Sequence, residues 1–365
     1  MRRTRKGADG MDRGKLVDYL ERYWTENKAK GLLAQALFRR EIKRGSFSRY
    51  KRKFFDGCWV LAPKRSDFFR FRFCFFTHPA LFHGDPGDRA DPEDIMGDAE
   101  GLKFRMVAGF LNRAGMGVMY ALPTGSQPVP PEGIRWLLYK YERDSEQLER
   151  VEPAAFFSRW EGRGRPSHGR MWSEGVKKAY MELEEEELLM LLLNEAFYTV
   201  FLKGRLRKPV GDPYDVDGFL LSYSTGTVLP LEIKEKFPAG SGDSAFFGID
   251  AGRVLMLLRI CLPNDANAVY LIREVEETGR RFLCWKFMPL SEIIATASWN
   301  LQRGGRGMGG QETQTIRLPY SSFERLDPRI LSDEHLRKIA SLPDEVKRLA
   351  AEFRKTLERE FGEGN

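Results

Sequence analysis

The spacing of the apolar residues changes after about residue 205, and this change constrains the fold more than any other feature of the chain. From Ser173 to about Arg205 the pattern is helical, whereas residues 217–223 and 228–237 read as strands joined by a short turn at 224–226. A helical pattern follows over 250–262, strand patterns over 268–275 and 281–287, and a short helix over 291–298. This order of elements predicts an α/β fold with a mixed β-sheet flanked by helices.

The regions around this core predict three parts. The stretch 162–169 is rich in Gly, Arg and Pro and predicts a linker. We therefore expect an α+β N-terminal domain over 1–165, the core over 170–300, and a Gly-rich loop with a C-terminal helix over 301–365. Residues 303–310 are expected to lack regular structure. The C-terminal helix should start near Pro343 and present an apolar stripe formed by Val346, Leu349, Phe353, Leu357 and Phe361.

The distribution of basic residues favours a polyanionic partner. The net charge is +7 and the sequence pI is about 9.1, with much of the base in the first 80 residues. Alternation over 68–76 places four phenylalanines, predicted to be core, on one face of a strand and two arginines on the other. The candidates for phosphate contacts, which could equally be solvated charges, are Lys51, Arg52, Lys53, Arg70 and Arg72.

Several classes of protein are disfavoured. The four cysteines form no CxxC pair and the four histidines share no metal-ligand spacing, so a zinc site or an iron–sulfur cluster is not expected. No run of 18 apolar residues and no secretory signal is present. The sequence therefore predicts a cytoplasmic protein with no membrane partner.

The two central strand patterns carry the residues with the clearest chemistry. Residues two apart in a strand face the same way, so Glu232, Lys234 and Lys236 share one side, and a hairpin would bring Asp217 near Glu232. Two carboxylates make a hard oxygen site suited to Mg²⁺, and an ammonium beside them can act on an attacking water. Asp215 is a weaker candidate for the first ligand, and a surface ion pair on an edge strand is the alternative for Glu232 and Lys234.

Asp217 followed by Glu232-Ile233-Lys234 resembles the PD-(D/E)xK nuclease superfamily, over roughly residues 175–296. The resemblance implies a restriction-endonuclease-like fold and a DNA endonuclease that uses Mg²⁺, with Mn²⁺ as a substitute. It also implies that Asp217, Glu232 and the Ile233 carbonyl bind the metal, while Lys234 acts on the nucleophilic water. Pro213 lies two residues before Asp215, so a literal Pro-Asp pair is absent.

Other residues take roles from the same resemblance. Glu195 lies 22 residues before Asp217 in an apolar stretch of the preceding helix, where it would hold a second metal or a water; a solvated helix face is the alternative. Lys236, Arg253 and Arg273 are either phosphate contacts or surface charges. Many relatives act as homodimers, a point on which this sequence is silent.

Three functions remain open from the sequence. The first is a metal-dependent DNA endonuclease, restriction-like or structure-specific, with double-stranded DNA as its partner. The second is a nucleic-acid-binding protein whose nuclease-like core is inactive. The third is an RNA-directed nuclease.

Overall fold

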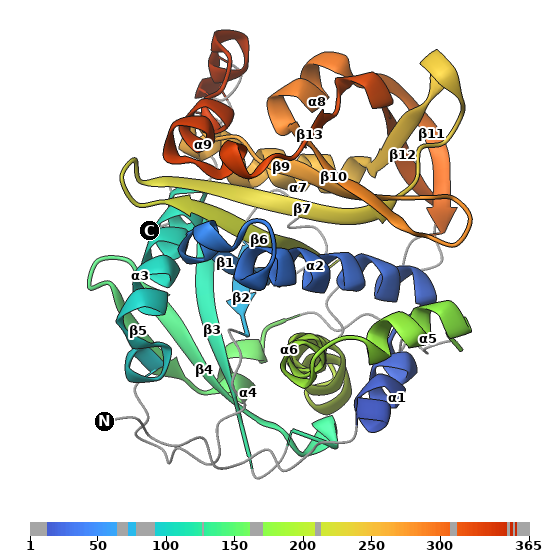
Figure 1. The fold of residues 1–365 in the computed structure, drawn as a ribbon. Helices are drawn as coiled ribbons and strands as arrows, with labels where there is room; N and C mark the ends of the chain where they lie inside the picture. Colours follow the sequence, from blue (N-terminus) through green and yellow to red (C-terminus); the bar gives the residue numbers. More distant parts are fainter. Residues whose placement is uncertain are drawn as a thin grey trace.

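A ten-stranded mixed β-sheet forms the centre of the protein (Figure 1). The structure, a computed structural model, describes residues 13–63, 72–77, 92–125, 128–160, 171–208, 213–306, 312–348, 351–352 and 355. The strand order is β13-β10-β9-β7-β6-β1-β2-β3-β4-β5. The pairs β7–β9 and β2–β3 are parallel and the other neighbours are antiparallel. The expected mixed sheet flanked by helices is therefore confirmed.

The strands of the large sheet have the following bounds: β1 (Phe54–Leu61), β2 (Arg72–Phe76), β3 (Met116–Thr124), β4 (Arg135–Glu142), β5 (Gln147–Val151), β6 (Tyr214–Ser222), β7 (Thr227–Lys236), β9 (Val269–Val275), β10 (Phe282–Pro289) and β13 (Glu324–Arg325). A second, three-stranded sheet consists of β8 (Phe246–Asp250), β11 (Ser298–Arg306) and β12 (Glu312–Pro319).

The helices are α1 (Arg13–Tyr23), α2 (Glu26–Arg44), α3 (Pro92–Arg113), α4 (Pro153–Phe157), α5 (Glu174–Met181), α6 (Glu185–Ala196), α7 (Ala251–Cys261), α8 (Leu290–Thr296) and α9 (Asp333–Ala340). A π-helical segment, η4 (Phe197–Arg205), continues α6. Short 3₁₀ turns are η1 (Ser48–Lys53), η3 (Pro131–Gly133), η5 (Gly242–Ser244), η6 (Leu262–Asn264), η7 (Tyr320–Ser322) and η8 (Pro328–Leu331).

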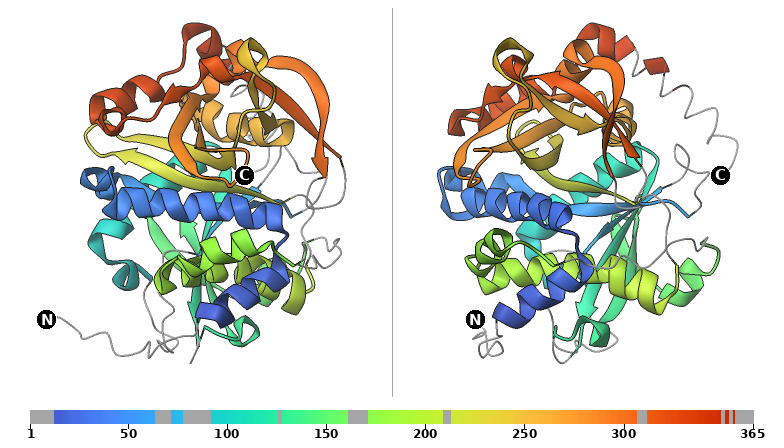
Figure 2. Two further views of the ribbon diagram at one scale, coloured as in Figure 1. Left: turned by 45° about the vertical axis from the view of Figure 1, so that its right-hand side comes forward. Right: turned by 90° about the vertical axis from the view of Figure 1, so that its right-hand side faces the viewer.

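Helices cover both faces of the sheet. Apolar residues of α3 and α7 pack on one face in a single cluster with β1, β3 and β6. On the other face α2 packs over β7 and β9, while α6 and η4 pack over β1, β2 and β4. Figures 1 and 2 show α2 lying along the sheet, with α1, α5 and α6 grouped on its far side. The burial of these apolar faces fixes where each helix lies against the strands.

The prediction of one continuous helix from Ser173 to about Arg205 is wrong. It breaks after α5, and Glu184 begins α6 with a capping box in which Glu184 and Glu187 satisfy each other's backbone N–H groups. The acidic stretch that reads as part of one helix is thus the start of a second one, because carboxylates favour the positive end of a helix.

The glycine-rich region also differs from expectation. Residues 303–306 belong to β11, so this part of the predicted loop is strand, because its backbone pairs with β12. Residues 307–311 and the linker predicted at 162–169 lie outside the described residues. Of the predicted C-terminal stripe, Val346 is described and packs with Leu262 and Leu342, whereas Leu349, Phe353, Leu357 and Phe361 lie outside the description.

Strands assigned by sequence to separate parts are neighbours in one sheet. The central strand β6 hydrogen-bonds to β1 along its length, from the pair Phe54 and Leu220 to the pair Val60 and Tyr214. Gly57 makes this close approach feasible, because a Cβ atom there would lie 1.8 Å from the Val216 carbonyl oxygen. The N-terminal region therefore contributes directly to the surroundings of the core strands.

Candidate functional site

The strands β6 and β7 separate at the residues that carry the predicted chemistry. Their pairing runs from Ser222 and Thr227 to Gly218 and Leu231 and is not continued beyond that pair. Farther along, β6 remains paired with β1 and β7 remains paired with β9. Asp217 and Glu232, the residues that follow the last pair, therefore lie where the sheet opens. We call this opening the strand fork.

Backbone groups of β7 face the strand fork. The backbone N–H of Ile233 has no backbone partner on β6 and instead donates a hydrogen bond to the Asp217 side chain, at 2.6 Å from Oδ2. The N–H and C=O groups of one strand residue point to the same side. The Ile233 carbonyl, a predicted metal ligand, is therefore directed toward the same opening.

The carboxylates of the strand fork are buried and face two cations. Asp217 is 6% exposed and Glu232 is 1% exposed. Lys234 Nζ lies 2.8 Å from Glu232 Oε1 and 3.6 Å from Asp217 Oδ2. Arg253 of α7 lies with Nε 3.2 Å from the same Glu232 oxygen and with Nη1 2.6 Å from Asp215 Oδ1. Because β7 is an internal strand, the alternative of a surface ion pair on an edge strand is wrong.

Both oxygens of the Glu232 carboxylate lack a hydrogen bond within the described part of the chain. Oε1 faces Lys234 and Arg253 as ion-pair partners, and the buried Oε2 accepts no hydrogen bond in the same part of the chain. A buried carboxylate oxygen is unfavourable unless it has a partner, because it has lost its water. The fork thus has an acceptor that a cation or a water can satisfy.

The same burial and charges shift the pKa values of the group. Burial raises the pKa of Asp217 to about 8; Lys234 opposes this shift, while the negative charge of Glu232 adds to it. Burial would also raise the pKa of Asp215, but the attraction of Arg253 outweighs it and holds that pKa at about 2. Burial lowers the pKa of Lys234, yet Asp217 and Glu232 outweigh this effect and raise it above its ordinary value.

Helix α2 supplies contacts that the sequence patterns did not indicate. Gln35 Nε2 donates a hydrogen bond to Asp217 Oδ1 at 2.6 Å, which fixes the second oxygen of that carboxylate. One turn later, Arg39 Nε donates to Asp56 Oδ1 of β1 at 2.6 Å. Gln35 is 182 residues away from Asp217 in sequence, so no local spacing could have revealed that contact.

A small pocket of about 50 Å³, which we call the fork pocket, opens beside Asp217 and has room for one or two waters. The residues that line it come from α2, β1, α6 and β6, with Thr77 after β2: Gln35, Arg39, Asp56, Gly57, Cys58, Thr77, Met190, Leu191, Leu193, Asn194, Asp215, Val216 and Asp217. The α6 residues in this lining include Asn194 but not Glu195, and Asn194 Oδ1 accepts a hydrogen bond from Thr77 Oγ1 at 2.9 Å.

Glu195, the predicted accessory acid, lies next to the fork pocket and contacts a different partner. It is 2% exposed and its Oε2 lies 2.5 Å from Lys28 Nζ of α2, so the alternative of a solvated helix face is wrong. Lys28 Nζ also lies 4.9 Å from the centre of the Trp59 ring. Burial raises the pKa of Glu195 although Lys28 opposes the shift. The structure therefore places Glu195 in a buried ion pair, separate from Asp217 and Glu232.

The basic residues predicted to contact phosphate fall into different environments. Arg253 is part of the strand fork, and Lys236 is half-buried, with a pKa lowered by burial and by the neighbouring Lys234. Arg273 pairs with the buried Glu235 at 2.6 Å. Only Lys236 of these three is left as a candidate for a direct phosphate contact near the fork.

The N-terminal candidates are similarly divided. Arg72 is 2% exposed and lies against the Tyr214 ring, where it is not accessible from the surface. Lys53 Nζ lies 2.5 Å from Asp333 Oδ1, and Lys51 is exposed on η1. Arg70 and the side chain of Arg52 lie outside the description.

We compared the chain with known proteins. No protein-family model, curated protein or solved structure gives a significant match. In the described residues, no helix is both long enough and apolar enough to span a membrane.

Proposed function

We propose that this protein is a metal-dependent nuclease that hydrolyses phosphodiester bonds in DNA at the strand fork. The observation that carries the proposal is the convergence of Asp217 and Glu232, two buried carboxylates from separating strands, on Lys234. Such a group is costly to bury, and perturbed carboxylates beside a pocket are typical of functional sites.

The residues of the fork fit a divalent cation. Glu232 Oε2 is a buried acceptor without a hydrogen bond in the described chain, and Asp217 and the Ile233 carbonyl face the same opening. These are hard oxygen donors of the kind that Mg²⁺ and Mn²⁺ prefer. When bound, the cation would offset the charge that develops on the phosphate and make a bound water more acidic.

The protein's own residues position the reacting groups. The Lys234 ammonium can donate hydrogen bonds to a water or to a phosphate oxygen beside the two carboxylates. Gln35 and the Ile233 N–H hold both oxygens of Asp217, while Arg253 holds Glu232 and Asp215. This support keeps the carboxylates in place without an exposed, flexible side chain.

A nucleic-acid-binding protein with an inactive core is the second candidate. It is favoured by the two cations that already face Glu232 Oε1. In addition, among the residues the structure covers, no three acidic, His or Cys side chains form a group that could hold a metal ion. In that case Lys234 and Arg253 would serve to neutralise the buried carboxylates rather than to act on a substrate.

Cleavage assays with the full chain separate the two candidates. Supercoiled, linear, branched and single-stranded DNAs, with RNA in parallel, are incubated with Mg²⁺, Mn²⁺ or EDTA. The nuclease proposal expects metal-dependent cleavage that is lost in Asp217→Asn and in Lys234→Ala and kept in Asp243→Asn, an exposed matched control. If the parent protein binds DNA but cleaves none of these substrates with either metal, the inactive-core candidate is supported instead.

A further inference from the structure

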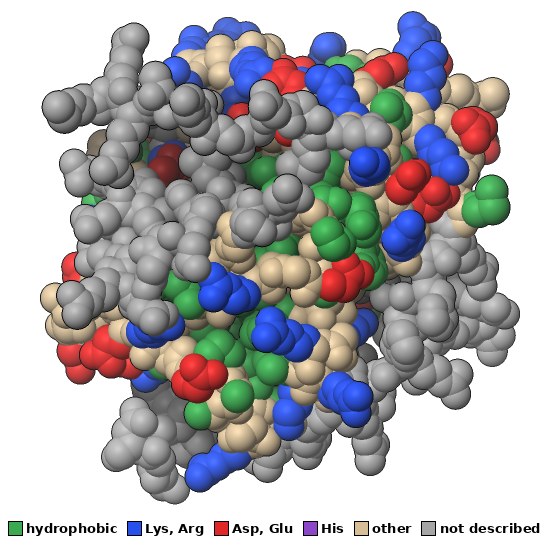
Figure 3. Space-filling view, turned by 90° about the horizontal axis from the view of Figure 1, so that it is seen from below, with side chains coloured by type: hydrophobic (Ala, Val, Ile, Leu, Met, Phe, Trp, Pro, Cys, Tyr) green, Lys and Arg blue, Asp and Glu red, His purple; other side chains and the backbone are tan. Residues whose placement is uncertain are grey.

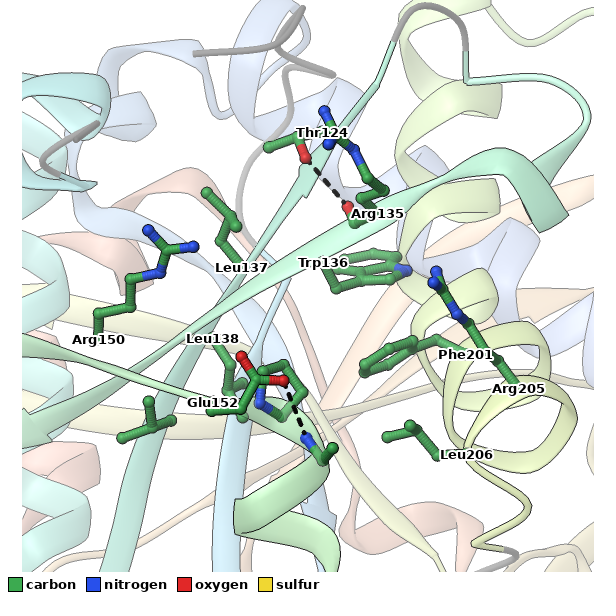
Figure 4. A pocket seen from close by; sticks show the side chains of 13 residues that line it. Thr124, Arg135, Trp136, Leu137, Leu138, Arg150, Glu152, Phe201, Arg205 and Leu206 are labelled. Atoms are coloured by element: carbon green, nitrogen blue, oxygen red, sulfur yellow. Dashed lines mark hydrogen bonds between the residues drawn. The ribbon is translucent and has the colours of Figure 1, made fainter. Parts of the chain in front are cut away.

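A second and larger cavity, of about 430 Å³, lies between β4, the end of β5, α4 and η4 (Figure 4). Its volume is within the roughly 300–1,000 Å³ typical of small-ligand sites. We call it the arginine pocket, and the residues that line it are Thr124, Arg135, Trp136, Leu137, Leu138, Arg150, Val151, Glu152, Pro153, Ala154, Phe201, Arg205 and Leu206.

The floor of the arginine pocket is apolar and firmly packed. The Trp136 ring meets Phe197 edge-on, with ring centres 5.2 Å apart, and lies 6.2 Å from the ring of Phe201. All three rings belong to the apolar cluster that fixes α6 and η4 on the sheet. A floor held in this way presents a preformed apolar surface to a flat ligand.

The rim of the arginine pocket is positively charged. Arg135, Arg150 and Arg205 are exposed and surround the apolar floor, as Figure 4 shows. Within the described chain Arg205 forms no salt bridge, and the carboxylate in the lining, Glu152, caps α4 by accepting a hydrogen bond from the Ala154 N–H at 3.5 Å. The pocket therefore suits a ligand with a planar apolar part and a negative charge.

We propose that the arginine pocket binds one nucleotide of a single-stranded nucleic acid. The base would contact the floor at Trp136 and Phe201, and the phosphate would contact the guanidinium groups of Arg135 and Arg205. Aromatic contacts with bases tolerate any sequence, and guanidinium groups match phosphate oxygens in geometry and charge. A base inside a duplex could not reach the floor, so the ligand is a single strand or the unpaired end of a duplex.

The position of the pocket links it to the strand fork. Asn194 lines the fork pocket, and Phe201 and Arg205 line the arginine pocket, on one continuous helical run. At the α-helical rise of 1.5 Å per residue these positions would be at most about 16 Å apart along the helix axis, and they are closer where η4 is π-helical, so a few nucleotides can span them. Figure 3 shows, on the face seen from below, hydrophobic side chains exposed among lysines and arginines. A strand held in the arginine pocket could thus extend toward Asp217, an extension that rests on the proposed function.

Binding without metal tests the pocket by itself. The full chain is titrated in EDTA against a fluorescein-labelled 12-nucleotide single-stranded DNA, with anisotropy as the readout. The double variant R135A/R205A should bind about 10- to 100-fold more weakly than the parent, since two charged contacts are lost. The salt slope should fall by about 0.7, since the two arginines contact one phosphate of a single strand.

A matched variant controls for general charge. R281A/R329A removes the same charge from side chains that are 75% and 82% exposed and outside the pocket. This control should bind almost as the parent does; an equal loss of affinity in the two double variants would overturn the proposal. Displacement by deoxyadenosine monophosphate at millimolar concentration would identify a free nucleotide as the ligand, whereas displacement by unlabelled oligonucleotide alone would identify the polymer.

The proposal and the proposed function can fail separately. Affinity that depends on Arg135 and Arg205 in a protein that cleaves nothing would leave the arginine pocket standing and contradict the nuclease. Metal-dependent cleavage with unchanged affinity and unchanged cleavage in R135A/R205A would contradict the pocket and leave the nuclease standing.

Discussion

Replacing Asp217 by asparagine should stabilise the metal-free protein in alkaline buffer. Asp217 is buried, and its pKa is raised from 3.8 to about 8, so the folded state resists its ionisation. Asparagine has the same shape without the charge. Its Oδ1 can accept from the Ile233 N–H, and its amide can donate to Gln35 once the Gln35 side-chain amide flips.

The size of the effect follows from the same pKa. A raised pKa means that the folded state binds a proton more tightly than the unfolded state does, so the free energy of unfolding falls as the pH rises from about 4 to about 8. At about 1.4 kcal/mol for each pKa unit, the upper limit is about 6 kcal/mol. Water entry and side-chain relaxation reduce this value, and we expect D217N to be more stable than the parent by about 2–3 kcal/mol at pH 9.

Urea unfolding of both proteins in EDTA, at pH 5, 7 and 9, measures this difference. The difference should be smallest at pH 5 and largest at pH 9, while D243N should match the parent at every pH. Adding Mg²⁺ at ten times its dissociation constant should stabilise the parent by about 1.4 kcal/mol and leave D217N unchanged. A D217N protein that is less stable than the parent at pH 9 would refute the reasoning, because burial of the charge would then not be unfavourable.

Three further substitutions probe the strand fork. Lys234→Ala should lower the cleavage rate by about 10²- to 10⁴-fold with DNA affinity kept, as measured by gel cleavage and anisotropy; a rate within threefold of the parent would remove Lys234 from the site. Gln35→Ala frees one oxygen of Asp217 and should reduce the cleavage rate by about tenfold while the melting temperature changes little. A fall in the melting temperature that accompanies the loss of cleavage would indicate a structural role for Gln35 instead. Gly57→Ala should destabilise the protein by about 3 kcal/mol or more in urea unfolding, because its Cβ would meet the Val216 carbonyl; a change below about 1 kcal/mol would show that the strands can shift apart.

The core strands and helices could be predicted because their signals are local. The alternating pattern places β6 and β7 and their turn within a few residues of the observed bounds, and Asp250 begins α7 as its N-cap. The neighbouring chemistry of Asp217, Glu232 and Lys234 follows from that hairpin, since a strand has a fixed two-residue period. The ends of helices are harder to predict, as the break between α5 and α6 shows, because a capping box inside an acidic stretch resembles continuous helix.

The strand hairpin and the three residues that it brings together depend on contacts between chain neighbours, so the amino-acid sequence is enough to predict them. The tertiary structure alone decided which side chains support that group: Gln35 on Asp217, Arg253 on Glu232, and Lys28 on Glu195. These partners depend on how α2 and α7 pack on opposite faces of the sheet, and packing joins residues with no sequence spacing in common. The separation of β6 from β7, which opens the site, likewise results from each strand pairing with a different neighbour.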